Sequence, residues 1–468
     1  MSSADKQPDT ASAQPESLYQ KHVKVYPREA HGFFARLRML GVITLLGIYY
    51  GVPWLRWDDR QAVLLDLPNR EFHIFGLTFW PQDFFYFAVL LIIAGIALFF
   101  FTALAGRLWC GFSCPQTVWT EAFLWIERKI EGTRAQQMKL DKAPFSSNKF
   151  YKKLTKHFIW ITLSAFTGFI FVGYFTPVDV LWNNIITLEL GPWESFWVIF
   201  YSLATYGNAG WLREQVCLYM CPYARFQSAM FDMDTLVISY DDKRGDPRGS
   251  RNKSVDREKE KLGDCIDCKL CVQACPTGID IRDGLQYQCI GCAACIDVCN
   301  EVMDKMNYPR GLVRYTTENE IQGKKTHVFR PRIILYASIL IAVTVALLVA
   351  IANRIPVELD IIRDRNALYR EIRGGLVENI YTLRIINMSA EKHRYRLAAS
   401  GLEGLTLINK KGDVDVNPGE VFHLNVQLRL DPVILKRPSN EVIFTLDRLG
   451  AEPVTVNESA RFIGPVIR

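Results

Sequence analysis

The chain has 468 residues, of which 49% are hydrophobic and 22% charged, and its formal net charge is +6. This length suggests several structural units, and the hydrophobic share excludes a disordered chain. Uncharged runs of about twenty residues alternate with strongly charged stretches, which excludes a simple water-soluble enzyme. The positive charge gathers on one side of these runs and therefore does not indicate nucleic-acid binding.

Five segments have the length and apolar character of a bilayer span, which takes about 20 residues. They cover residues 39–55, 84–106, 158–178, 195–212 and 333–353. For any one of them the alternative is a buried core helix. Residues 1–35 are polar and do not resemble a cleavable signal peptide, so we expect a cytoplasmic N-terminal tail.

The loops between these segments differ in their content of Lys and Arg. The loop 107–157 carries ten, the loop 179–194 carries none, and the loop 56–83 carries three against five acidic residues. Because positively charged loops stay inside, this predicts an inner N-terminus, five spans and an outer C-terminus. In a bacterial inner membrane, residues 231–330 would be cytoplasmic and residues 355–468 periplasmic.

The four-span region, residues 36–230, contains a weak internal repeat. Arg107 begins RLWCGFSCP and Arg213 begins REQVCLYMCP, so the second and the fourth predicted spans are each followed by Cys-x-x-x-Cys-Pro. Because Pro fits the first turn of a helix, we expect Cys114 and Cys221 at helix N-termini, where the helix dipole would lower the thiol pKa.

Four soft sulfur ligands at one membrane level suit Cu(I) or a redox-active disulfide. We therefore take them as candidate catalytic and copper-binding residues; the alternative is that they are buried and inert. Three Met residues near the second pair could add thioether ligands, although packing is the commoner role of Met. The four Cys are Cys110, Cys114, Cys217 and Cys221, and the Met are Met220, Met230 and Met233.

A Cys-rich segment over residues 263–305 carries the strongest motif. Its first run has the spacing Cys-x2-Cys-x2-Cys-x3-Cys-Pro of bacterial [4Fe–4S] ferredoxins, and a second run repeats it with Asn300 in place of Pro. In such runs the fourth Cys binds the other cluster, so the spacing predicts two clusters with crossed ligation. One set is Cys265, Cys268, Cys271 and Cys299; the other is Cys289, Cys292, Cys295 and Cys275. Zinc, the alternative, usually takes Cys in more widely separated pairs.

The last segment of the chain, residues 355–468, changes to a strand-like pattern that follows the fifth span (331–354). Apolar residues alternate over 378–387 (Ile380, Leu383, Ile385), over 421–430 and at 442–446. Turn signals at 410–413 and 417–420 separate these runs. Several short strands in about 100 residues predict an immunoglobulin-like β-sandwich, here without Cys. The expected fold is thus a polytopic α-helical membrane protein with a ferredoxin-like two-cluster domain and this sandwich.

The order of these parts resembles a known family. Spans are followed by WCGFSCPQ, CLYMCPYARFQSAMFD, YDDKRGDPRG and the double Cys run, and then by a last span and the Cys-free β-domain. This order resembles the cytochrome c oxidase accessory proteins of the CcoG, FixG and RdxA type, polyferredoxin-type membrane iron–sulfur proteins, over nearly the whole chain. The resemblance implies an oxidoreductase, a cupric reductase that converts Cu(II) to Cu(I) for assembly of cbb3-type cytochrome oxidase.

The resemblance also implies partners, namely subunits of that oxidase or copper-delivery assembly factors. The sequence does not identify an electron donor. It contains no dinucleotide fingerprint for a nicotinamide cofactor and no P-loop for ATP. Two other functions stay open: electron transfer from quinol, and a scaffold that gathers assembly partners through the β-domain. The edges of a sandwich also allow self-association, so a homodimer stays open.

Overall fold

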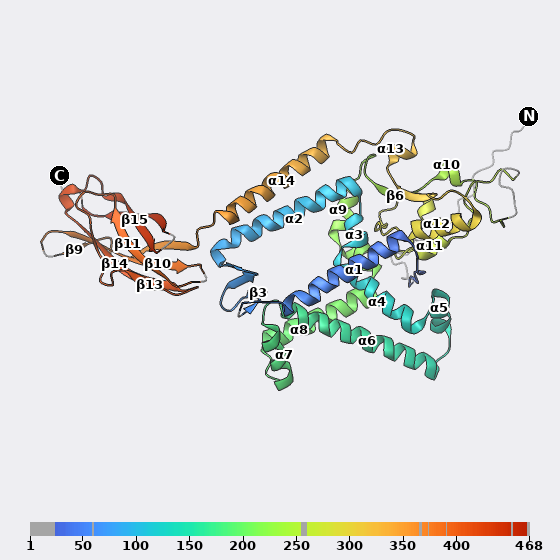
Figure 1. Cartoon of the computed structure of the whole chain (residues 1–468), viewed down its shortest axis with the longest axis horizontal. Helices are drawn as coiled ribbons and strands as arrows, with labels where there is room; N and C mark the ends of the chain where they lie inside the picture. The colour runs from blue at the N-terminus through green and yellow to red at the C-terminus, as the bar shows by residue number, and fades with distance from the viewer. Residues whose placement is uncertain are drawn as a thin grey trace, which may run out of the picture. The chain divides into compact units, whose positions relative to one another are not determined.

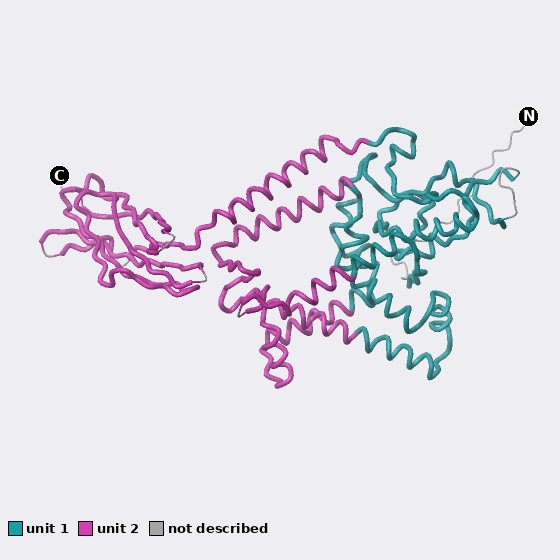
Figure 2. The backbone as a smooth tube through the Cα atoms, viewed as in Figure 1, with its two compact units in different colours: residues 1–42, 105–160, 207–326 teal, residues 43–104, 161–206, 327–468 magenta. Residues whose placement is uncertain are grey.

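The computed structural model describes residues 24–58, 60–253, 260–364, 367–372, 374–389, 391–450 and 453–465 (Figure 1). Most of the expected N-terminal tail therefore lies outside the described residues. The chain forms two compact units (Figure 2). Unit 1 comprises residues 1–42, 105–160 and 207–326, and unit 2 comprises residues 43–104, 161–206 and 327–468.

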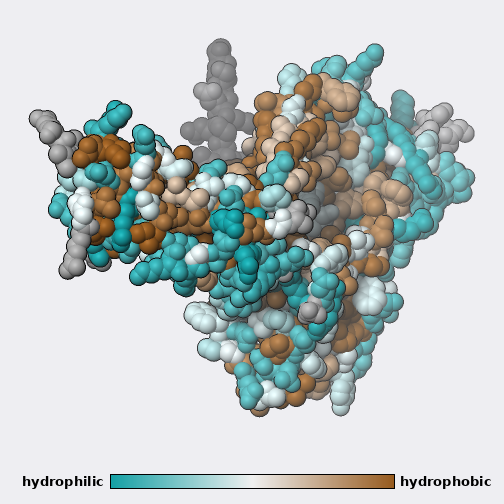
Figure 3. Space-filling model, turned by 60° about the vertical axis from the view of Figure 1, so that its left-hand side comes forward, coloured by the Kyte–Doolittle hydropathy of each residue, from teal (hydrophilic) through white to brown (hydrophobic). Residues whose placement is uncertain are grey.

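Four helices of the described chain are long and apolar enough to cross a membrane. They coincide with four of the predicted segments, and the third begins and ends earlier than predicted. The first, second and fourth of these helices are largely exposed, as Phe85 and Leu91 illustrate, whereas 44% of the apolar window of the third is buried. Hydrophobic surface is visible in Figure 3. Such exposure is expected where lipid covers a helix. These helices are α1 (Phe33–Gly51, extended by the 3-10 helix η1 to Trp54), α2 (Phe84–Ala105), α6 (Ser147–Val172) and α14 (Pro331–Ala352).

The segment predicted as a span over 195–212 combines two kinds of helix. Its α-helical part is α8 (Pro192–Thr205), and the chain continues as the π-helix η3 (Tyr206–Leu212). A second π-helix, η4 (Val216–Met220), follows a turn in which Arg213 has a positive φ of 46°. The α-helix alone is shorter than the other candidate spans, and π-helical turns are frequent at functional sites.

Shorter elements connect the spans. Between α1 and α2 the chain forms strands β1 (Arg56–Trp57) and β2 (Arg60–Gln61) and a three-stranded sheet of β3 (Val63–Asp66), β4 (Glu71–Ile74) and β5 (Leu77–Phe79). Further helices are α3 (Leu108–Phe112), α4 (Pro115–Glu131), α5 (Arg134–Lys142), α7 (Val178–Thr187) and α9 (Pro222–Met230).

The Cys-rich region is built on a small two-stranded sheet and two helices. Strand β6 (Val237–Tyr240) pairs antiparallel with β7 (Val313–Thr316), so the sheet joins the two ends of the region. Helices α11 (Leu270–Ala274) and α12 (Ala294–Met306) each begin within one Cys run. Both share one buried apolar cluster with the sheet, to which α11 contributes Cys271, α12 contributes Ile296 and Met303, and the strands contribute Ile238 and Val313.

The C-terminal domain is the predicted sandwich of two antiparallel sheets. One sheet has the order β12-β14-β10-β8 with β9 beside β10, and the other has the order β13-β11-β15-β16. The predicted turns at 410–413 and 417–420 lie between β12 and β13 and between β13 and β14. The strands are β8 (Val357–Arg363), β9 (Arg370–Glu371), β10 (Val377–Asn387), β11 (His393–Ser400), β12 (Thr406–Ile408), β13 (Val414–Val416), β14 (Val421–Leu430), β15 (Ser439–Leu449) and β16 (Val454–Ile463).

The alternation of side chains fixes which residues fill the sandwich. On β15, Val442, Phe444 and Leu446 are buried as predicted. On β10 the inward residues include Tyr381, which is fully buried, while Ile380 lies half-buried on the opposite face. The grouping of Ile380 with Leu383 and Ile385 was therefore wrong. Successive residues of a strand point to opposite faces, so Ile380, an odd number of residues from both, faces away from them.

Replacement of Phe444 by Ala should destabilise the sandwich. The Phe444 ring is buried between the sheets, with its centroid 5.2 Å from that of Tyr381, so truncation leaves a cavity. We expect a loss of about 3–5 kcal/mol in the free energy of unfolding, measured by denaturant titration. Ile443→Ala, on the outer face at 40% exposure, is the control and should cost about 1 kcal/mol or less. Equal losses would contradict the assigned faces.

Candidate functional site

The two Cys runs adopt the same unusual backbone. In the first, Asp267 and Lys269 flank Cys268 with φ of 51° and 56°; in the second, Gly291 and Ala293 flank Cys292 with φ of 69° and 59°. Left-handed conformations are unfavourable for residues with a side chain, so they persist where the surrounding structure requires them. Each loop thus wraps around a centre in the same way, and each ends in a helix, α11 or α12.

Each predicted ligand set lines a cavity of its own. One cavity is lined by Cys265, Cys268, Cys271 and Cys299 together with Tyr240. The other is lined by Cys275, Cys289, Cys292 and Cys295, and also by Cys271. The fourth Cys of each run therefore lies with the first three of the other run. This placement supports crossed ligation of two [4Fe–4S] clusters.

The residues present fit a cluster better than a single ion. Among the described residues, no group of three or more His, Cys, Asp or Glu side chains converges as one metal ion requires. The thiols line voids instead, and burial raises the pKa of Cys271, Cys292 and Cys299 to about 12. Such thiols ionise readily only against a cation, which iron supplies. Cys268 is exposed, whereas Cys265 and Cys271 are buried, so the first set reaches the protein surface.

Asn300, which replaces the Pro of the first run, does not form a turn. Helix α11 ends at Ala274, with Cys275 as its C-cap before Pro276, but α12 continues past Cys299 to Met306. A Pro inside that helix would break it. The Asn300 side chain accepts a hydrogen bond from the Gly311 amide at 3.0 Å instead.

The two Cys-x-x-x-Cys-Pro motifs have the predicted helix positions. Cys114 is the N-cap of α4 and Cys221 is the N-cap of α9, each with Pro as the first helical residue. The expected lowering of the thiol pKa is wrong for Cys114: burial raises it more than the amides of Gln116 and Thr117 lower it. Removal of a thiolate from water outweighs the helix N-terminus there.

All four membrane thiols gather in one place, although 103 residues separate Cys114 from Cys217. Each thiol interacts electrostatically with others of the set: Cys217 with the remaining three, and Cys110 with Cys114 and Cys221. Burial raises the pKa of Cys110 to about 11 and that of Cys217 to about 12, so both carry their protons at neutral pH. By contrast, Met220 and Met233 are largely exposed.

The first Cys pair lies directly against the second cluster loop. A Cβ added to Gly111 would stand 2.5 Å from the carbonyl oxygen of Gly291, and one added to Gly291 would stand 3.0 Å from that of Arg107. Gly111 has no room for a side chain, and a side chain at Gly291 would require a shift of its neighbours and a left-handed backbone with φ of 69°. Cys110 and Cys217 also pack against the apolar cluster that contains Cys292. The thiols and the second ligand set are therefore neighbours.

The two repeats brace each other through buried polar contacts. From the first repeat, Arg107 donates to the carbonyl of Ala224 on α9, and the Cys110 thiol contacts Gln227 Oε1 at 3.2 Å. In return, Arg213 of the second repeat donates to Glu127 of α4 at 2.9 Å. Each repeat therefore satisfies polar groups of the other, which fixes the four thiols together.

Two further contacts tie α1 to the cluster loops. The carboxylate of Asp297 accepts hydrogen bonds from the amides of Phe34 and Ala35, at 3.2 and 2.7 Å, and so caps α1 from α12. Arg38 of α1 donates to the carbonyl of Cys292.

Sequence reasoning missed Gly111, Asp297, Arg38 and Gln227. A signal existed for Asp297, an acidic residue inside a Cys run, and for Gly111, inside a Cys-x-x-x-Cys motif. Their partners are distant in the chain, so the sequence could not identify them.

Family models match three parts of the chain. Residues 212–318 match a 4Fe-4S dicluster domain, residues 87–132 match a 4Fe-4S binding domain, and residues 347–465 match the "IG-like fold at C-terminal of FixG". The second match covers Cys110 and Cys114.

Similar proteins extend over most of the chain. The nitrogen fixation protein FixG of Rhizobium meliloti is 39% identical, over 88% of this chain and 87% of its own length. The protein RdxA of Cereibacter sphaeroides is 41% identical, over 83% of this chain and 85% of its own length. A crystal structure of a FixG-related protein from Vibrio parahaemolyticus is 34% identical, with a TM-score of 0.22, and covers 24% of this chain and 97% of its own.

Crossed ligation predicts how iron is lost in double variants. Cys265 and Cys299 would bind the same cluster, so Cys265→Ser with Cys299→Ser should keep about half of the iron. Cys265→Ser with Cys275→Ser should lose nearly all of it, because one ligand of each cluster is removed. Iron analysis and electron paramagnetic resonance of the reduced proteins measure both. The reverse result would show that each run binds its own cluster.

Gly111→Ala tests the contact between the Cys pair and the cluster loop. The new methyl group would overlap the backbone of Gly291 and Cys292, so the loop must move. We expect less iron per protein and a lower melting temperature, because overpacking typically costs about 1–3 kcal/mol. Gly95→Ala on α2 is the matched control, since no atom lies within 4 Å of its added Cβ. A normal iron content and stability in Gly111→Ala would contradict the close packing.

Proposed function

The chain belongs to the FixG and RdxA family of membrane iron–sulfur proteins, and we propose that it transfers electrons from its clusters to Cu(II) at the four membrane thiols. The observation that carries this proposal is the packing of Cys110 and Cys217 against the apolar cluster around Cys292. Thiols that prefer Cu(I) thus stand beside a ligand of a one-electron carrier.

The clusters, when bound, supply one electron to each Cu(II) that is reduced to Cu(I). The chain's own residues bind copper and handle protons. Because burial keeps the thiols of Cys110 and Cys217 protonated, each thiol that becomes a copper ligand releases one proton. Gln227 Oε1 holds the Cys110 thiol, and the contacts of Arg107 and Arg213 keep the two pairs facing each other. Copper is the substrate here, so it would bind to a pair of thiolates only transiently.

We place the clusters and the N-terminus in the cytoplasm and the β-domain in the periplasm. The distribution of Lys and Arg between the loops supports this orientation. Unit 1 contains the start of α1, the residues after α2, the start of α6 and the residues after α8. These are the helix ends that should share one side if the spans alternate in direction.

The Cu(I) produced would serve the assembly of a cbb3-type cytochrome oxidase. The resemblance of the whole chain to oxidase accessory proteins supports this role, and the partners would be oxidase subunits or copper-delivery factors. Quinol-linked electron transfer without copper, and a scaffold without catalysis, are the competing functions that the following experiment separates.

Simultaneous replacement of Cys110, Cys114, Cys217 and Cys221 by Ser should slow copper reduction strongly but leave cluster assembly intact. The pre-reduced protein is mixed anaerobically with Cu(II), and cluster oxidation is followed beside Cu(I) capture by a chelator. We expect cluster oxidation by Cu(II) to slow at least about tenfold, because the copper ligands are lost. Iron content should stay unchanged, since these Cys are not cluster ligands.

Ile443→Ala, an exposed position of the β-sandwich, is the control and should reduce copper normally. An unchanged rate in the fourfold variant would exclude the thiols as the copper site. The quinol-linked function would be favoured if Cu(II) does not oxidise the reduced clusters of the parent protein but a quinol analogue reduces the oxidised ones.

A further inference from the structure

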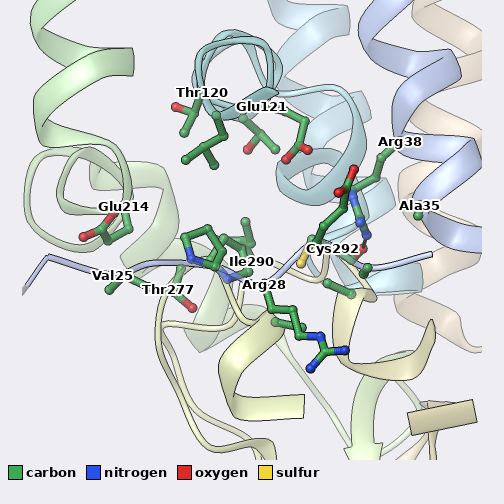
Figure 4. Close-up of a pocket in the computed structure, with 18 of the residues that line it drawn as sticks. Val25, Arg28, Ala35, Arg38, Thr120, Glu121, Glu214, Thr277, Ile290 and Cys292 are labelled. Carbon is green, nitrogen blue, oxygen red and sulfur yellow. Dashed lines mark hydrogen bonds between the residues drawn. The ribbon is translucent and has the colours of Figure 1, made fainter. Parts of the chain in front are cut away.

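A cavity of about 520 Å³ lies in unit 1 beside the second cluster loop (Figure 4). Its walls come from residues 25–39, from the first turns of α4 and from the loop around Cys292, and Cys217 also lines it. This volume falls within the range of small-molecule sites, which is about 300–1,000 Å³. Neither the cluster ligation nor the copper reaction proposed above uses this space.

The cavity carries an excess of positive charge. Its lining includes three Glu, one His and five Arg: Glu29, Glu121, Glu214, His31, Arg28, Arg36, Arg38, Arg128 and Arg213. Arg128 pairs with Glu121 at 2.8 Å, and Arg213 pairs with Glu127 at 2.9 Å. The hydrogen bonds of Arg36 and Arg38 to the described residues go to backbone carbonyls, those of Gly32 and Cys292. Their charges are therefore not neutralised by a carboxylate of the described chain.

Two of these arginines also hold unused hydrogen-bond donors. Arg213 Nη1 and Arg128 Nε are buried and have no hydrogen-bond partner among the described residues. The Arg213 side chain is 8% exposed and that of Arg128 is 15% exposed. A buried donor without an acceptor is costly, but both atoms are enclosed, so the arginines that a ligand in the cavity can reach directly are the exposed Arg28 and Arg36. The planar fork of Arg forms bidentate hydrogen bonds with phosphate, whose several oxygens can serve more than one arginine.

We propose that this cavity binds a phosphate-bearing ligand. Its phosphate would lie among the arginines, and its remainder would pack against Met39, Leu124 and Ile290. Two sources share this chemistry: a soluble phosphate ester such as flavin mononucleotide, and the headgroup of an anionic phospholipid. A lipid headgroup fits this location because the candidate span α1 begins at Phe33, within the segment that forms the cavity wall.

The site would also influence the neighbouring cluster. Arg38 and Cys292 stand side by side in the cavity wall, and Cys292 is a ligand of the second set (Figure 4). A bound anion makes the addition of an electron nearby less favourable. Occupancy should therefore lower the reduction potential of the second cluster.

The test measures binding to the full-length, cluster-loaded protein, so it does not depend on copper reduction. Flavin mononucleotide and inorganic phosphate are titrated by calorimetry, and retained phosphatidylglycerol is counted by mass spectrometry of the detergent-solubilised protein.

Arg213→Gln removes a buried arginine, but its loss also breaks the pair with Glu127 and threatens folding. The double variant Arg28→Gln, Arg36→Gln therefore accompanies it, because both side chains are exposed at the cavity. Arg394→Gln with Arg396→Gln, on the surface of the β-domain, removes the same charge as a control.

We expect saturable binding of one of these probes, weakened about tenfold or more by the Arg28 and Arg36 double variant and unchanged in the control. Binding of flavin mononucleotide or phosphate would identify a soluble ligand, and retention of phosphatidylglycerol would identify a lipid headgroup. In either case the potential of one cluster should fall on binding. If no probe binds, or if the double variant and the control bind equally, the proposal is wrong.

Discussion

The backbone contact between Gly111 and Gly291 is the constraint on which the rest of unit 1 depends. Because Gly111 leaves no room for a Cβ and Gly291 leaves very little, the backbones of the chain after α2 and of the second cluster loop lie very close together. This contact brings a thiol pair that follows a membrane helix beside a ligand of a ferredoxin-like domain. The packing of Cys110 and Cys217 around Cys292 follows from it. Without this approach the membrane and the cluster domain would be two separate redox parts.

Duplication explains much of the architecture. The two Cys runs share one pattern of left-handed residues, and the two Cys-x-x-x-Cys-Pro motifs share an N-cap Cys before an N1 Pro. In both cases each copy depends on the other. Each Cys-lined cavity takes its fourth Cys from the other run. Each membrane repeat forms hydrogen bonds with polar groups of the other repeat. Such mutual dependence holds distant segments of the chain in one place.

Burial sets the chemistry of the site more than local dipoles do. Cys114 stands at a helix N-terminus, yet burial raises its thiol pKa. Charged groups are buried where they have partners, as in the pair of Glu127 and Arg213, because an unpaired buried charge is costly. In the cavity beside Cys292 the buried Arg213 follows this rule, whereas Arg36 and Arg38 have only backbone carbonyls as hydrogen-bond partners among the described residues. The proposed anion site depends on these arginines without a carboxylate.

The sequence by itself determined the apolar helices, both ligand spacings, the N-cap positions of Cys114 and Cys221 and the β-sandwich. These features depend on local patterns: hydrophobic length, residue spacing, Pro placement and alternation of side chains. Where a pattern was ambiguous, as for Ile380 on β10 or the mixed α- and π-helix after Pro192, the packed structure decided. Only the tertiary structure brought Gly111 to Gly291, Asp297 to the start of α1 and five arginines to one cavity. These contacts join residues far apart in the chain, and no local pattern specifies the partner of a buried glycine, carboxylate or guanidinium.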